Sequence, residues 1–259
     1  MSESKKHHYV PQVMLRQFGF NNKQIYVFDK TNLRSFPSSI VDAGSENNFN
    51  TLEYHGEKIN FESVFQDVDS DFSGIQNVLL NGGGANALGD KDRARLLEIL
   101  VVQLARSKIH RTSFASIVQQ TNRTIGNLYG DGFEYPIPNE NDVRRIAVSS
   151  LQDTPELVSA LSGKVGFLIK ANESERFIIS DNPVVLHNSF PYGDRGLSSL
   201  GVEIYLPLST EITLALYCPS VFRKMDAAVH PSSDMDDENR IIFRGLIDRV
   251  RNGLPVSLG

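Results

Sequence analysis

The apolar positions of the chain follow three different patterns, and the first occupies about sixty residues at the amino terminus. Short β-branched and aromatic runs there lie between turn residues, which predicts strands at 24–29, 33–40 and 49–54. An apolar stretch after Pro11 predicts a short helix at 11–18, because proline suits the first turn of a helix. We expect a small group of strands in this part of the chain.

Between about residues 60 and 161, apolar residues recur at spacings of three and four, which is typical of helices. Asn60 is a candidate cap for a helix that reaches about residue 80. The longest helix is predicted from about 91 to 128, and because its middle is apolar almost all round, we expect it to be buried. Two shorter helices are predicted at 141–151 and 155–161.

The pattern changes again at about residue 164, where short apolar runs return. They predict five strands, at 164–170, 177–180, 184–186, 202–206 and 212–217. The first two are expected to form a hairpin across 172–175, and a last amphipathic helix is predicted at 238–250 after an exposed acidic stretch at 234–238.

Strands, then helices, then strands are typical of the α+β class. We predict a central long buried helix with flanking helices, a small N-terminal strand group, and a C-terminal antiparallel or mixed sheet. A disordered tail at 1–6 would precede a single domain at 7–259, with its helical centre at about 60–161 and its sheet region at about 164–250.

Composition narrows the class of protein. Of the 259 residues, 40% are hydrophobic and 22% are charged, which is ordinary for a globular protein. The net charge of -5 argues against general attraction to nucleic acid but leaves room for a local basic face. A single cysteine excludes an intrachain disulfide framework and a cysteine-rich zinc module. Without a visible secretory signal or an apolar run of about 20 residues, we expect a cytoplasmic protein and no membrane partner.

The first candidate site is the pair His7-His8, directly before the helix at Pro11. Adjacent residues of an extended segment point to opposite sides, so one imidazole can enter a pocket while the other stays in solvent. Such a group can be a general base or a metal ligand near neutral pH. The alternative is a histidine that only caps the start of the helix.

The second candidate lies on the predicted central helix, where Gln103, Arg106 and His110 fall within an arc of about 60°. Arg106 would bind a phosphate or a carboxylate, and Gln103 would hold either Arg106 or the ligand. The alternative is an internal ion pair between Arg106 and Glu62 or Asp181. Lys108 and Arg111 are expected in solvent.

The third candidate is Ser180-Asp181-Asn182 before Pro183, at the end of a predicted strand. Asp181 could bind a metal or orient a histidine, and the alternative is a turn that bonds its own backbone. Glu62 is a candidate carboxylate ligand, or a partner of the helix dipole. No zinc signature is present, so a metal site would need distant His, Glu and Asp, which suits Mg²⁺ or Mn²⁺ as well as Zn²⁺.

These residues resemble the motifs of a widespread, mostly bacterial family of uncharacterised proteins that is known as a domain of unknown function. The resemblance covers about residues 6–216 and starts from His-His-Tyr-Val-Pro-Gln and Leu-Arg-x-Phe at 7–18. It continues through Glu62, Gln-x-x-Arg at 103–106, Ser-Asp-Asn-Pro at 180–183 and Pro-Leu-Ser at 207–209. The family usually follows the arginine with Thr-Pro, where this chain has Ser107-Lys108, so we expect the helix to continue. The resemblance implies no particular reaction.

The residues suggest a phosphodiester hydrolase of the nuclease kind, used in bacterial defence or as a toxin. His7 or His8 would be the base or a metal ligand, Glu62 and Asp181 would bind metal or orient the histidine, and Arg106 would neutralise the phosphate. The alternative is a module without chemistry that senses a nucleotide or another anion, or that binds a partner protein or a second copy. A third possibility is an internal hydrogen-bond network that only fixes the fold.

Overall fold

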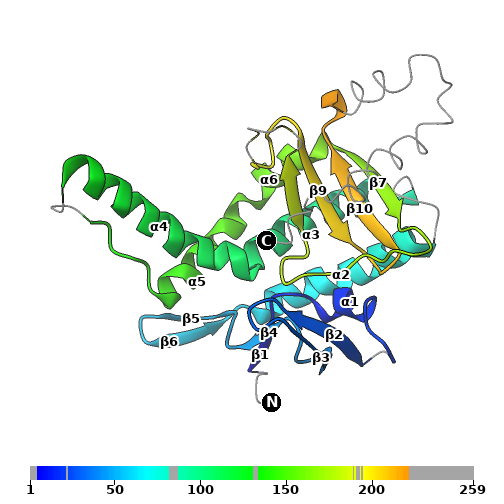
Figure 1. Cartoon of the computed structure of the whole chain (residues 1–259), viewed down its shortest axis with the longest axis horizontal. Helices are drawn as coiled ribbons and strands as arrows, with labels where there is room; N and C mark the ends of the chain where they lie inside the picture. Colours follow the sequence, from blue (N-terminus) through cyan, green and yellow to red (C-terminus); the bar gives the residue numbers. More distant parts are fainter. Residues whose placement is uncertain are drawn as a thin grey trace. The chain divides into compact units, whose positions relative to one another are not determined.

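The computed structural model describes residues 5–21, 23–81, 87–130, 134–188, 190, 193 and 195–221 (Figure 1). The chain divides into two compact units. Unit 1 combines residues 1–73 with 98–155, and unit 2 combines residues 74–97 with 156–259. The expectation of one domain over 7–259 stays a prediction, because compactness alone does not show which parts fold independently.

Unit 1 contains three antiparallel strand pairs, with β1 bonded to β4, β2 to β3 and β5 to β6. Their bounds are β1 Lys6–His8, β2 Gln24–Asp29, β3 Arg34–Ser39, β4 Ser45–Asn47, β5 Thr51–Tyr54 and β6 Glu57–Asn60. The predicted strands at 24–29 and 33–40 are confirmed as a hairpin. β1, β4 and β6 were not predicted, and Lys6, which we expected in a disordered tail, pairs with Asn47 in the first of these sheets.

The helices of unit 1 include α1 Gln12–Arg16, the first part of α2 Glu62–Asn81, the last part of α3 Asp90–Arg106, α4 Lys108–Tyr129 and α5 Glu140–Ser149. The cap predicted for α2 is confirmed, since the N–H of Glu62 donates to Oδ1 of Asn60 at 2.9 Å. The core of the unit is apolar: it includes Val10, Met14, Phe65, Phe72, Ile99 and Leu100.

The single long helix predicted at about 91–128 is wrong, because the chain leaves the helix at Ser107 and starts a new one. Ser107 takes an extended conformation, and its hydroxyl accepts the N–H of His110 as the cap of α4. The same hydroxyl donates to the carbonyl of Leu104 in the last turn of α3. Serine competes well for backbone hydrogen bonds, which favours a cap over a helix interior.

Unit 2 contains one four-stranded sheet in the order β7-β10-β9-β8, and every neighbouring pair is antiparallel. The bounds are β7 Val165–Lys170, β8 Val185–Asn188, β9 Val202–Pro207 and β10 Ile212–Tyr217. Ile169, Ala215 and Tyr217 form the core of one face. The short η2 helix Ser150–Asp153, still part of unit 1, leads into α6 Thr154–Ser162, most of which belongs to unit 2. These sheets and helices confirm the α+β class.

The predicted strand at 177–180 and its hairpin across 172–175 are wrong. That segment has no strand conformation, although the N–H of Phe177 donates to the carbonyl of Thr210. β7 instead pairs with β10, more than forty residues later in the chain. The predicted helix at 238–250 and the acidic stretch at 234–238 lie outside the described residues. Within the part of the chain that the structure describes, no helix has the length and apolar character needed to cross a membrane.

Candidate functional site

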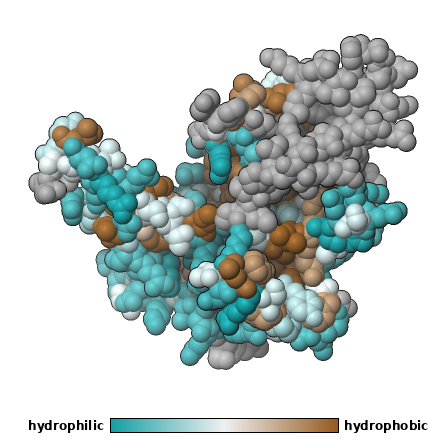
Figure 2. Space-filling view, in the orientation of Figure 1, coloured by the Kyte–Doolittle hydropathy of each residue, from teal (hydrophilic) through white to brown (hydrophobic). Residues whose placement is uncertain are grey.

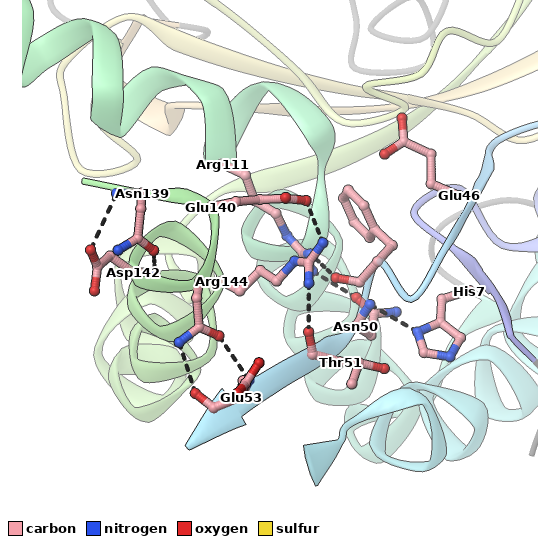
Figure 3. A network of polar contacts seen from close by, with 12 residues as sticks. His7, Glu46, Asn50, Thr51, Glu53, Arg111, Asn139, Glu140, Asp142 and Arg144 are labelled. Atoms are coloured by element: carbon pink, nitrogen blue, oxygen red, sulfur yellow. Dashed lines mark hydrogen bonds and ion pairs between the residues drawn. The ribbon is translucent and has the colours of Figure 1, made fainter. Parts of the chain in front are cut away.

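The polar centre of unit 1 is organised by Asn50, directly before β5 (Figure 3). Its backbone N–H donates to Nδ1 of His7 at 2.9 Å, and its carbonyl accepts the N–H of Phe61. Its side chain donates to Oε2 of Glu62 at 2.6 Å and accepts from Nη2 of Arg111 at 2.6 Å. One buried asparagine therefore joins a histidine, a carboxylate and a guanidinium.

The two histidines of β1 are both buried, which corrects the expectation that one of them stays in solvent. His7 is 1% exposed, and because a backbone N–H can only donate, its Nδ1 carries the lone pair that Asn50 binds. Nε2 of His8 lies 3.1 Å from the carbonyl of Val41 and therefore donates to it. Each imidazole is held in one tautomer by a different backbone group.

His8 also lies close to charged groups. Its backbone N–H donates to Oε1 of Glu62 at 3.4 Å. Burial lowers the pKa of His8, while the charge of Glu62 and the carbonyl of Val41 oppose this shift and the charge of Arg106 adds to it. The imidazole is therefore neutral at pH 7, with its basic lone pair on Nδ1.

Arg106, at the end of α3, is the most completely buried cation of unit 1 that the structure describes, with 2% exposure. Its Nη2 pairs with both carboxylate oxygens of Asp69, at 3.0 and 3.2 Å, and its guanidinium lies over the ring of Phe65. This pair takes the place of the alternative considered from sequence, an internal ion pair of Arg106 with Glu62 or Asp181. Burial raises the pKa of Asp69, and the charge of Arg106 opposes that shift.

Arg111 is buried as well, contrary to the expectation that it lies in solvent. Its Nη1 donates to the carbonyl of Phe49, and its guanidinium carbon lies 3.6 Å from the centroid of the Phe49 ring. Burial, together with the charge of Arg144, lowers the pKa of Arg111 to about 10, so the group remains protonated at pH 7. Lys108 was also expected in solvent. Its side chain is half exposed and forms an ion pair with Glu46, which is half exposed as well.

His110 does not share the predicted helix face with Gln103 and Arg106, because the break at Ser107 puts His110 on a different helix. Nε2 of Gln103 donates to the carbonyl of Tyr9 at 2.8 Å, which ties the histidine segment to α3. His110 stacks edge-on against Phe114, and burial lowers its pKa, with a further lowering by Arg111.

Ser180, Asp181 and Asn182 belong to unit 2, whereas the polar centre belongs to unit 1. The hydroxyl of Ser180 donates to the carbonyl of Asn182 and accepts its N–H, which is the local turn that we considered as the alternative. Asp181 is exposed. The structure thus brings together His7, His8, Glu62 and Arg106 in unit 1. Ser180, Asp181 and Asn182 lie in unit 2.

Sequence reasoning missed three members of the centre: Asn50, Asp69 and Arg111. Asp69 carried a usable signal, because it follows Glu62 by seven residues and therefore lies on the same side of α2. Asn50 and Arg111 carried none, since their contacts join segments about sixty residues apart. Among the described residues, no group of three or more His, Cys, Asp or Glu is arranged to hold a metal ion.

The architecture and the polar centre define an α+β protein with a mostly buried His-Asn-Glu-Arg network in its first unit. The chain belongs to the family described as "Protein of unknown function (DUF4238)", whose model matches residues 6–245. A comparison with curated proteins and one with solved structures give no match.

Proposed function

We propose that the protein is a phosphodiester hydrolase of the nuclease kind, and that its site is the part of the polar centre around His8. The observation that carries the proposal is the state of this imidazole: buried, neutral at pH 7, and next to a carboxylate. Such a group can accept a proton from an attacking water or hydroxyl, which is the task of a general base.

Glu62 and Asp69 are the members of the centre that reach its surface. Glu62 is half-buried, and the side chain of Asp69 is 29% exposed. Glu62 holds the segment of His8 through the backbone N–H, which fixes the position of the base. In the proposed reaction, these two carboxylates orient the base and the attacking water.

Arg106 takes a different role from the one expected from sequence. Its guanidinium is sealed behind Phe65 and paired with Asp69, so direct contact with a phosphate would require this ion pair to open. In this arrangement Arg106 is a positioning group for Asp69. The proposal makes no use of Asp181, which lies in unit 2.

The test is an assay of the pure protein with RNA, DNA and small nucleotides, with and without Mg²⁺ or Mn²⁺. His8→Gln is the informative variant, because its amide can still donate to the carbonyl of Val41 but cannot act as a base at neutral pH. We expect wild type to cleave at least one substrate and His8→Gln to lose that activity by a factor of about 100 or more.

His55→Asn is the matched control, since His55 is exposed on the β5–β6 turn in a positive-φ conformation that asparagine tolerates. The control should retain wild-type activity. A wild-type protein that is inert over the whole panel, or a His8→Gln variant that is as active as wild type, would contradict the proposal.

A second candidate function, binding of an anion without chemistry, is favoured by a different observation. Among the described residues, Nε of Arg106 and Nε of Arg111 are buried without a hydrogen-bond partner. Native proteins leave few such donors unpaired, so an anionic group or an ordered water is the natural partner. In this case, phosphate or a nucleotide should raise the melting temperature of wild type, and Arg106→Gln should abolish the rise, with no turnover.

The third possibility, a network that only fixes the fold, is favoured by the burial of His7, Gln103 and Arg106. It predicts that substitutions in the network lower stability and that ligands have no effect.

We further propose that the motifs at 7–18, 103–106 and 180–183 are characteristic of the family. A role in bacterial defence or as a toxin and a cytoplasmic location remain part of this proposal.

A further inference from the structure

The hairpin of β2 and β3 carries aromatic side chains that the core of unit 1 does not use. Tyr26 is 69% exposed and Phe28 is 59% exposed, and they lie on the same face of β2 because they are two residues apart. The ring of Phe20 stacks on Tyr26, with centroids 4.7 Å apart and an interplanar angle of 25°. Figure 2 shows pale and tan residues over the position of this hairpin, at the lower right of the view.

The segment of the chain that carries these rings has a positive net charge, in contrast to the chain as a whole. Residues 1–40 contain six Lys or Arg and two Asp or Glu, a net charge of +4, whereas the whole chain has a net charge of -5. Lys23, Lys30 and Arg34 of the hairpin are all exposed. Its only acidic residue, Asp29, lies 3.5 Å from Arg34. Arg34 lies on the other face of the hairpin, over Phe36, so it is the hairpin as a whole that carries the positive charge that attracts a polyanion.

We propose that this hairpin face is a stacking platform for single-stranded nucleic acid. Unpaired bases stack on exposed aromatic rings, and basic side chains beside the rings bind the backbone. Residues two apart on a strand are separated by about 6.8 Å, so the two rings are neighbours on the same face. A duplex hides the faces of its bases and cannot use such a platform.

The hairpin also leads directly to the proposed site. The N–H of Ile40 donates to the carbonyl of Lys23 at 2.9 Å and closes the hairpin, and the next residue, Val41, accepts the hydrogen bond from His8. A single strand of nucleic acid held on the platform would thus lie next to the segment that orients His8, the proposed general base. The inference rests on the proposed function in so far as it names the substrate, a single strand.

The experiment measures binding of a fluorescein-labelled oligothymidylate by anisotropy, in EDTA, so that binding is read without turnover. Wild type should bind the single strand more tightly than a duplex of the same length. The double variant Tyr26→Ala/Phe28→Ala should bind it at least about tenfold more weakly. Tyr129→Ala is the matched control, because Tyr129 at the end of α4 is even more exposed, and it should bind like wild type.

The inference would be overturned by absent binding by wild type, by equal affinity for duplex and single strand, or by a double variant that binds like wild type. A double variant that changes the sedimentation coefficient of the protein would also overturn it, since the face would then join two copies of the chain. Failure of the proposed function looks different: wild type and His8→Gln would bind the strand equally, the double variant would bind weakly, and none would cleave.

Discussion

The backbone N–H of Asn50 donates to Nδ1 of His7 at 2.9 Å, although 43 residues separate the two in sequence. The bond fixes the neutral tautomer of His7 with its proton on Nε2. It also ties the first strand of the chain to the start of β5, next to the side-chain bonds of Asn50 with Glu62 and Arg111. The histidine segment is thus held by the same residue that hydrogen-bonds a buried guanidinium and a half-buried carboxylate.

Replacement of Asn50 by alanine should therefore destabilise the protein strongly. The change leaves Nη2 of Arg111 and Oε2 of Glu62 without their shared partner in a mostly buried place. We expect the free energy of unfolding to fall by about 3 kcal/mol, because unpaired buried polar groups, charged ones above all, cost more than a lost bond. Urea denaturation followed by circular dichroism measures the change.

Asn32→Ala is the control for that measurement. Asn32 also donates from its amide to a carboxylate, Oδ2 of Asp29 at 2.7 Å, but the pair is exposed. Its loss should change the free energy of unfolding far less than the loss of Asn50, because both groups can bond to water instead. Equal effects of the two substitutions would mean that burial of the Asn50 network contributes nothing to stability.

The elements that local pattern determines were predictable, and those that depend on distant partners were not. The β2–β3 hairpin has alternating β-branched and aromatic residues around turn chemistry, and α2 has its cap and its apolar spacing within one segment. β1 has only three residues, Lys-His-His, with no strand pattern, and it exists because β4 pairs with it. The candidate site follows the same rule, since the burial of Arg111 depends on Phe49 and Asn50 about sixty residues earlier.

The break between α3 and α4 gives a second prediction. The hydroxyl of Ser107 accepts the N–H of His110 and donates to the carbonyl of Leu104, so it serves both helix ends. Ser107→Ala should lower the free energy of unfolding by about 1 kcal/mol, as loss of a helix cap does. Ser113→Ala is the matched control, because its hydroxyl only bonds the preceding turn of α4 on an exposed surface. A Ser107→Ala variant as stable as wild type would show that the cap is dispensable.

The pair of Arg106 and Asp69 gives a third prediction, which a double-mutant cycle can test. Asp69→Asn leaves a buried guanidinium without its counter-charge, and Arg106→Gln leaves a carboxylate that burial already disfavours. Each single change should cost about 3 kcal/mol or more, and the double change should cost clearly less than the sum, because it removes both charges. The exposed pair of Arg145 and Asp142 provides the control cycle, with a coupling of less than about 1 kcal/mol. An additive cycle for Arg106 and Asp69 would mean that their ion pair contributes nothing to stability.

The histidines give a fourth prediction, on the pH dependence of stability. Burial holds the pKa of both His8 and His110 below the ordinary value of 6.5, so protons bind the unfolded chain more readily than the folded one. By linkage, stability that is fully present above pH 6.5 decreases as the pH falls through 6.5 toward the folded-state pKa values. Urea denaturation between about pH 8 and about pH 5.5 should show this decrease in wild type and a smaller one in His8→Gln/His110→Gln. His55→Asn, which changes an exposed histidine, should keep the wild-type decrease.

The raised pKa of Asp69 has the opposite effect on the pH dependence of stability, since its contribution decreases as the pH rises from 3.8 through the folded-state value. This contribution is common to all three proteins. The difference between the curves therefore isolates the two imidazoles, and identical curves would show that neither is held neutral by the fold.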